Sequence, residues 1–418
     1  MFKEKDENLI VKLPFGSRDI FPVEAQEREA IKKLIGNEFR FWGYGEVKTP
    51  IFEFTKNISA GVGKNWKDKL ISFFDIDGNL VSLRADMTVP IARLTGMRIK
   101  ASQLPVRFFY FANSFRQSAL QKGEKRVLNQ AGLEFIGSSS FASDIEVLAI
   151  LSNILKKLEI KDFKIGIGHV KLIEGLCSWL NLDTKGIEYI KDNLVSKNIV
   201  SVEEFLIKKD RQKTNIFIEL LKPENDIKNL EKIISRISEK KVTPGFEYLK
   251  KVYNVLTELG LGKYLLIDLS MIREFDYYSG LLFEVYSSRI TDLLGSGGRY
   301  DGLIKKFGLD VPATGFALDV DLLHKSLEES RLDSFRAEER AILFGDENDC
   351  LRLIQFSEKL KRKKIIVELL FENENNLEKM AVDRKCRYIF KIKPDSSDLI
   401  IFDLNRKSKE IKKIEEYK

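Results

Sequence analysis

The sequence predicts an α+β protein with a helical insertion and a separate small α/β domain at its C-terminal end. Three observations predict this class. Apolar runs of strand length flank polar, glycine-containing turns, a pattern typical of antiparallel hairpins. The stretch from about 172 to 262 is helical and lysine-rich, without strand-like alternation. After about Arg331, apolar runs and amphipathic stretches follow in the order β-α-β-α-β-β.

Bulk composition excludes several classes of protein. The chain has 418 residues, of which 44% are hydrophobic and 32% charged, as in globular proteins of two or three domains. No apolar run approaches the roughly 20 residues of a membrane helix, and the charged N-terminus is unlike a signal peptide. We therefore expect a cytoplasmic protein. Three scattered cysteines predict neither a disulfide framework nor a zinc site, and two histidines are too few for a multi-histidine metal site. We expect no cofactor. A net charge of +7 neither requires nor excludes nucleic acid.

The N-terminal part predicts a helix, a strand and a hairpin. Apolar residues at helical spacing predict a helix from Val23 to about Arg40. Val47 to Phe54 is strand-like, with Pro50 at a bend or an edge. In residues 71–84, two short apolar runs around Asp77-Gly78 predict a hairpin.

Asp86 and Thr88 stand just before a helix expected from Val89. Their side-chain oxygens are suited to capping that helix, because they accept hydrogen bonds from free backbone N–H groups. The same carboxylate and hydroxyl are also suited to a ligand's ammonium group. The sequence leaves both interpretations open.

Phe108–Gly137 predicts an antiparallel hairpin with a long polar tip. Its first run ends at Arg116, and its second carries Gln130 and Glu134. These two are separated by an even number of residues, so both face the same side of the strand. A cation, an amide and a carboxylate together suit a small zwitterion. A sheet edge with a solvated polar face is an equally consistent interpretation.

The remaining core contains three further patterns. A helix is expected over Phe141–Leu158, with Ser143 and Glu146 at capping-box spacing. The apolar runs of residues 265–286 predict a hairpin with Arg273, Tyr277 and Tyr278 between them. Gly295–Gly302 predicts a tight glycine-rich element, interpreted as either a phosphate cradle or a turn. This glycine-rich element also contains Tyr300.

In this order, the patterns resemble the catalytic core of a class II aminoacyl-tRNA synthetase of the histidyl type. The resemblance rests on four stretches: FGSRDIFP, SFRQ…KRVLNQAGLEFIG, IREFDYYSGLLFE and GSGGRYDGL…GFALDVDLL. It implies an antiparallel sheet flanked by helices, usually in a dimer. It places this core at 1–330, with the helical insertion at about 172–262. Residues 332–418 then resemble a reduced anticodon-binding domain.

The resemblance is uneven between the two ligand half-sites. In the family, FRxE supplies an arginine for the reacting phosphate and a glutamate for adenine; here Arg116 remains, but Ser118 stands for the glutamate. The third motif ends in GFAxGxxR, where this chain has Asp319 for the glycine and Leu322 for the arginine. An aliphatic side chain provides no charge for a triphosphate, and a carboxylate repels it. The resemblance therefore implies that ATP chemistry is lost.

The amino-acid half-site is better kept. Asp86 stands where the family's glutamate meets the ammonium group of the amino acid, and Thr88 keeps its place beside it. Glu274 replaces the glycine of the family's RGLDYY element. The resemblance implies a histidine-binding set lined by the following residues: Asp86, Thr88, Arg116, Gln130, Glu134, Arg273, Tyr277, Tyr278 and Tyr300.

A retained amino-acid pocket without ATP chemistry is the profile of a synthetase-like family, the regulatory subunits of short-form ATP phosphoribosyltransferase. LRADMTVPIAR, NQAGLE and GIGHV, which contains His169, resemble elements of that family. The resemblance implies a non-catalytic subunit that acts in the first step of histidine biosynthesis. Its implied partners are a short-form catalytic subunit, histidine as effector, and a second copy within a hetero-oligomer. Neither tRNA nor a membrane is an expected partner. A divergent active histidyl-tRNA synthetase and a synthetase-like RNA- or protein-binding module remain alternatives.

Overall fold

The computed structural model describes residues 13–62, 64–117, 125–223, 226–237, 240, 242–271, 277–335, 339–371, 374–394 and 396–417. The chain divides into two compact units between Glu328 and Glu329. Within the described ranges, no helix is both long and apolar enough to cross a membrane.

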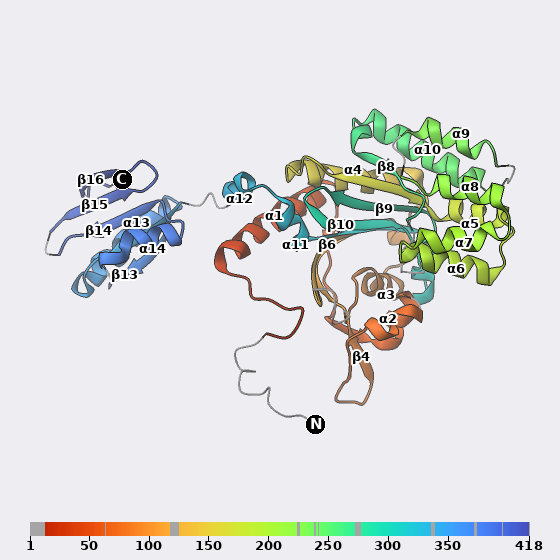
Figure 1. Cartoon of the computed structure of the whole chain (residues 1–418). Helices are drawn as coiled ribbons and strands as arrows, with labels where there is room; N and C mark the ends of the chain where they lie inside the picture. The colour runs from red at the N-terminus through yellow and green to blue at the C-terminus, as the bar shows by residue number, and fades with distance from the viewer. Residues whose placement is uncertain are drawn as a thin grey trace, which may run out of the picture. The chain divides into compact units, whose positions relative to one another are not determined.

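An eight-stranded sheet forms the centre of the first unit (Figure 1). Its strand order is β1-β5-β6-β11-β10-β9-β7-β8. The six inner strands pair antiparallel, and the two outermost pairs are parallel. The predicted α+β class is thus confirmed. The strands are β1 (Gly45–Glu46), β5 (Val106–Phe115), β6 (Val127–Ile136), β7 (Lys164–His169), β8 (Leu265–Ile267), β9 (Leu281–Ser287), β10 (Ile290–Arg299) and β11 (Ala313–Asp319).

The hairpin predicted for residues 108–137 is present as β5 and β6, but the one predicted for residues 265–286 is wrong. β8 pairs in parallel with β7, and β9 pairs with the other side of β7. Two apolar runs close in sequence therefore flank a third strand. The segment that carries Tyr277 separates β8 from β9 in the sequence and is long enough to let them lie on opposite sides of β7. A tight turn would have forced β8 and β9 to pair with each other.

One face of the sheet is covered by α1 (Pro22–Phe41), α4 (Phe141–Lys157) and α11 (Val320–Ser326). The predicted first helix is confirmed, and Ile31, Ile35 and Phe39 of its apolar stripe are fully buried. The Phe39 ring of α1 lies 5.3 Å from Phe109 of β5 and 6.0 Å from Phe316 of β11, measured between ring centroids. Since side chains alternate along a strand, the neighbours of Phe109 and Phe316 point to the opposite face.

That opposite face is bordered by α2 (Thr55–Val62), α3 (Thr88–Arg98) and a three-stranded sheet. The small sheet has the order β2-β4-β3, with β2 (Phe52–Phe54), β3 (Ser72–Phe74) and β4 (Leu80–Leu83). The β3–β4 hairpin confirms the turn signal, since Gly78 adopts φ 78°. The strand predicted for residues 47–54 is shorter than expected, because regular pairing in β2 begins only after Pro50.

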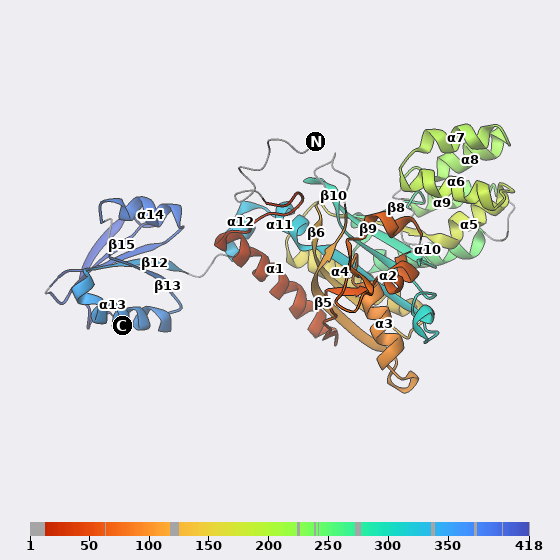
Figure 2. The ribbon, with the colours of Figure 1, turned by 90° about the horizontal axis from the view of Figure 1, so that it is seen from below.

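The predicted helical insertion is confirmed as a group of helices beside the β7–β8 edge (Figures 1 and 2). Its members are α5 (Val170–Trp179), α6 (Thr184–Val195), α7 (Ile199–Ile207), α8 (Arg211–Leu220), α9 (Ile227–Ile234) and α10 (Thr243–Glu258). α5 and α10 contact β7 directly. The loop after α6 thereby comes to the rim of the sheet.

Two local predictions are wrong. Gly295 and Gly297 lie inside β10 rather than in a turn or a phosphate cradle, and a Cβ on Gly297 would lie 2.2 Å from the carbonyl oxygen of Gly315. Close packing between strands explains the glycines there. Helix α4 is capped by Ser140, whose hydroxyl accepts from the Ala142 amide, so Ser143 is not the cap. An earlier serine in the same run took that position.

The second unit contains a five-stranded sheet of order β13-β12-β14-β15-β16. The predicted α/β pattern is confirmed, with one strand, β16, that the sequence did not reveal. Every residue of β16 is exposed, and four of its six residues are charged, so its apolar signal is absent. The elements are α12 (Glu329–Phe335), β12 (Arg340–Phe344), α13 (Cys350–Arg362), β13 (Ile366–Leu370), α14 (Leu377–Asp383), β14 (Tyr388–Ile392), β15 (Asp398–Asp403) and β16 (Ser408–Lys413).

Candidate functional site

The register of the central sheet gathers polar side chains on the face opposite α1. Gln130 and Glu134 of β6 lie opposite Asp319 and Gly315 of β11, respectively. On the next strand, Ser296 of β10 pairs with Ala317 of β11. All these positions are related by even steps, so they share one face. The small residues leave space above the sheet, and the longer ones project into it.

We call that space the inner pocket, a cavity of about 50 Å³ lined by β5, β6, β10, β11 and the start of α3. Glu134 lies at its bottom and is 1% exposed. Its carboxylate accepts a hydrogen bond from the Thr88 hydroxyl at 2.9 Å and another from the Tyr300 hydroxyl. The three side chains come from three separate segments, which the fold brings together.

Asp86 provides a second carboxyl group in the inner pocket and is 5% exposed. It accepts from the Val89 amide and from the Tyr277 hydroxyl, each at 3.3 Å. The sequence left open whether Asp86 and Thr88 cap the helix or face a ligand, and the structure gives a different answer for each residue. Asp86 both helps to cap α3 and faces the pocket, whereas the Thr88 hydroxyl bonds to Glu134 and not to the helix.

Burial makes both carboxyl groups weak acids. It raises the pKa of Glu134 to about 8, although hydrogen bonds from Tyr300 and Thr88 oppose this, and the nearby Asp86 charge adds to it. It raises the pKa of Asp86 to about 6, against the opposing effects of the Val89 amide and Arg116. A cationic or N–H-bearing ligand would stabilise the charged forms. The inner pocket is therefore suited to a group that brings positive charge or donors.

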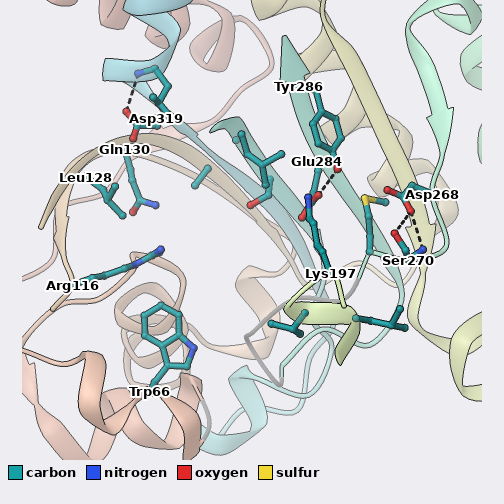
Figure 3. Close-up of a pocket in the computed structure, with 18 residues that line it drawn as sticks. Trp66, Arg116, Leu128, Gln130, Lys197, Asp268, Ser270, Glu284, Tyr286 and Asp319 are labelled. Carbon is teal, nitrogen blue, oxygen red and sulfur yellow. Dashed lines mark hydrogen bonds between the residues drawn. The ribbon is translucent and has the colours of Figure 1, made fainter. Parts of the chain in front are cut away.

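Arg116 and Gln130 lie where the inner pocket opens into a larger central cavity of about 430 Å³. The Arg116 guanidinium lies 5.0 Å from the Trp66 ring centroid and donates to the Ala85 carbonyl at 3.1 Å. Figure 3 shows Arg116, Gln130 and Trp66 on one side of this cavity, across from Lys197 and Glu284.

The side-chain oxygen of Gln130 is buried and has no hydrogen-bond partner among the parts of the chain that the structure describes. Buried polar atoms are nearly always paired, so an open acceptor at a cavity mouth fits a ligand that donates. Together with Arg116, it provides an acceptor and a cation at the same opening.

On the other side of Arg116 lies an outer cavity of about 1180 Å³, which Trp66 and Leu322 also line. Its lining includes Arg116, Asp319 and Leu322, three of the residues that the resemblance assigns to the nucleotide half-site. Asp319 caps α11 by accepting from the amides of Asp321 and Leu322, at 2.8 and 3.1 Å. Burial raises the pKa of Asp319, while Lys125 lowers it.

The structure brings together all the predicted site residues that it describes. Arg273 lies outside the described residues, as do Ser118 and Glu274. The other eight line the inner pocket: Asp86, Thr88, Arg116, Gln130, Glu134, Tyr277, Tyr278 and Tyr300. His169 does not join them: it caps α5, where its Nδ1 accepts from the Lys171 amide at 3.2 Å.

Sequence reasoning missed Tyr110 and Ser296, which also line the inner pocket. Tyr110 was hidden in an aromatic run, and the signal that identifies it is its even spacing from Ala112, which pairs with Gln130. It also missed Trp66, which follows α2 and lines the central and outer cavities.

Comparisons with known proteins show which proteins this chain is similar to. The family model described as histidyl-tRNA synthetase matches residues 16–323. The chain is 36% identical over 321 residues to an ATP phosphoribosyltransferase regulatory subunit of Moorella thermoacetica, covering 76% of this chain and 82% of the relative. It is 31% identical to a protein of the same name from Clostridium botulinum, over 87% of each chain.

A solved structure shows the same architecture. The ATP phosphoribosyltransferase regulatory subunit/histidyl-tRNA synthetase from Bacillus halodurans superposes with a TM-score of 0.79 and 27% sequence identity, over 93% of this chain and 99% of that one. The chain therefore belongs to the histidyl-tRNA synthetase-like family and, within it, to the ATP phosphoribosyltransferase regulatory subunits.

Proposed function

We propose that this protein is a non-catalytic subunit that binds free histidine in the inner pocket and conveys its level to a short-form catalytic ATP phosphoribosyltransferase. The complex would carry out the first step of histidine biosynthesis in the cytoplasm, with this chain as a homodimer within a hetero-oligomer. The synthetase-like core over 1–330 would hold the effector. The unit at 332–418 would be a reduced anticodon-binding domain without a tRNA partner.

The chemistry of the inner pocket matches the groups of histidine. Asp86, which is electrostatically coupled to Arg116, would take the ammonium group, and Arg116 the carboxylate. Glu134 and the Tyr300 hydroxyl lie deeper and would meet the imidazole, which has one N–H donor and one nitrogen acceptor. Coupling between such an effector site and a distant active site typically amounts to about 1–3 kcal/mol.

One observation carries the proposal: the two half-sites differ. Eight predicted residues converge on the inner pocket, while the outer cavity presents Leu322 and the buried carboxylate of Asp319. Losing a desolvated charge contact typically costs about 2–5 kcal/mol. Since about 1.4 kcal/mol corresponds to a factor of ten in rate, two such losses would disable adenylation.

Calorimetry with the purified chain, paired with an assay of histidine-dependent exchange of pyrophosphate into ATP, tests the proposal. We expect histidine to bind and no exchange to occur. Asp86→Asn should weaken histidine binding, while Asp310→Asn, which alters an exposed ion pair with Lys305, should not. Robust histidine-dependent exchange of pyrophosphate into ATP would contradict the proposal, and so would an absence of histidine binding.

A divergent, active histidyl-tRNA synthetase is the second candidate, favoured by the family model that matches residues 16–323. It predicts charging of histidine onto tRNA by the purified chain. The same exchange assay separates it from the first proposal, because aminoacylation requires the adenylate that the exchange reaction detects.

A further inference from the structure

A chain of alternating charges from four separate segments runs along the outer cavity, and all its members except Glu24 line that cavity. Arg18, in the lead-in before α1, donates two hydrogen bonds to Glu24. Arg28, one turn further along α1, lies 2.8 Å from Glu24 and 2.8 Å from Asp321 of α11. We call the whole set the charge chain: Arg18, Glu24, Arg28, Asp321, Lys125 and Asp319.

Lys125, just before β6, closes the charge chain. Its ammonium group lies 3.4 Å from Asp321 and 3.6 Å from Asp319. The Arg28 and Asp321 side chains are only 5% and 10% exposed, so their attraction is weakly screened by solvent. Three cations and three carboxylates alternate, and their formal charges cancel.

This cancellation matters because the outer cavity otherwise resembles an anion site. Its volume, about 1180 Å³, is sufficient for a nucleotide, and six basic residues line it against four acidic ones. Polyphosphate recognition requires cations that are available to the phosphate oxygens. Three of the six, Arg18, Arg28 and Lys125, belong to the charge chain. A phosphate that binds to Arg18, Arg28 or Lys125 must displace a carboxylate that is fixed to the protein.

We infer that Asp319 and Asp321 are specificity determinants of the outer cavity: they neutralise Lys125 and Arg28 from within the chain and thereby exclude phosphate-bearing anions such as nucleotides and pyrophosphate. A single carboxylate at Arg116 is unaffected, because Arg116 is outside the charge chain. The cavity would thus admit an amino acid and reject a polyphosphate. This inference is independent of whether histidine is the ligand of the inner pocket.

Two substitutions each remove one of the carboxylates that neutralise Lys125. Asp319→Asn removes one charge and keeps the cap of α11, because an asparagine oxygen accepts from backbone amides as well as aspartate does. Asp321→Asn leaves Arg28 with Glu24 as its remaining charged partner. The matched control is Asp310→Asn, which removes the same charge from a surface pair with Lys305 outside the cavity.

The probe is inorganic pyrophosphate, titrated into the full-length wild type and each variant by calorimetry, with thermal unfolding measured in parallel. We expect Asp319→Asn to bind pyrophosphate at least about tenfold more tightly than the wild type, with Asp310→Asn unchanged. Asp321→Asn should melt earlier than the wild type, and pyrophosphate should raise its melting temperature more than it raises that of the wild type.

Either of two results would overturn the inference. One is a wild type that binds pyrophosphate as tightly as the variants. The other is a folded Asp319→Asn protein that gains no affinity. If Asp321→Asn does not fold, Asp319→Asn decides the question alone. Histidine titrated into the same samples keeps this outcome separate from the proposed function, because loss of histidine binding would not alter the pyrophosphate comparison.

Discussion

Replacing Glu134 by glutamine should remove a pH dependence of stability that the wild type carries. Burial raises the pKa of Glu134 from 4.5 to about 8, so the folded protein holds a proton that the unfolded chain has released over this range. Stability therefore falls as pH rises through the window and levels off above about 8. The gap between 4.5 and about 8 corresponds at most to about 5 kcal/mol, at about 1.4 kcal/mol per pH unit.

The effect of Glu134 is best measured between pH 6 and 8. Burial raises the pKa of Asp86 to about 6, so Asp86 titrates mostly below this range. Urea unfolding at pH 6, 7 and 8 should show the wild type losing about 2 kcal/mol more than Glu134→Gln. Glu258→Gln, on the exposed end of α10, should parallel the wild type. Parallel curves for the wild type and Glu134→Gln would refute the argument that burial holds a proton on Glu134.

Three further predictions concern a buried ion pair, a glycine beside Glu134 and a surface ion pair. Arg299→Ala leaves the fully buried Asp144 carboxylate without its 2.8 Å partner and should cost about 3–5 kcal/mol in urea unfolding; a loss below 1 kcal/mol would contradict this. Gly315→Ala places a Cβ 2.0 Å from Glu134 and should abolish histidine binding measured by calorimetry, so retained affinity would show that the pocket is elsewhere. Lys305→Ala breaks a surface ion pair with Asp310 and should leave the melting temperature close to that of the wild type, which thermal unfolding checks.

Apolar residues that recur with the period of a strand or a helix predicted those elements that bury one face and expose the other. The β5–β6 hairpin follows from two apolar runs around a polar loop, and the common face of Gln130 and Glu134 follows from the pleat. The failures have a shared cause. β8 and β9 are separated by β7, and β16 has no apolar face, so neither arrangement leaves a local signal.

The sequence indicated eight of the residues that line the inner pocket, but not the contacts between them. The sequence indicated the carboxylates, yet only the fold shows that Thr88 donates to Glu134 and that Asp86 meets Tyr277 across 191 positions. The charge chain was hidden for the same reason. In the sequence, Arg28 is an ordinary residue of an amphipathic helix, and Asp321 is an ordinary residue of a first helical turn. Their ion pair depends on how α1 and α11 pack against each other, which the sequence does not show.

The central claim is that histidine acts on this chain as an effector of a partner enzyme. The most direct measurement is the rate of ATP phosphoribosyl transfer by a reconstituted complex of this protein with a short-form catalytic subunit, over a range of histidine concentrations. We predict that histidine changes the rate, and that Asp86→Asn shifts the response to higher histidine while the complex still assembles. An identical histidine response in the wild-type and Asp86→Asn complexes, or no response in the wild type, would contradict the account.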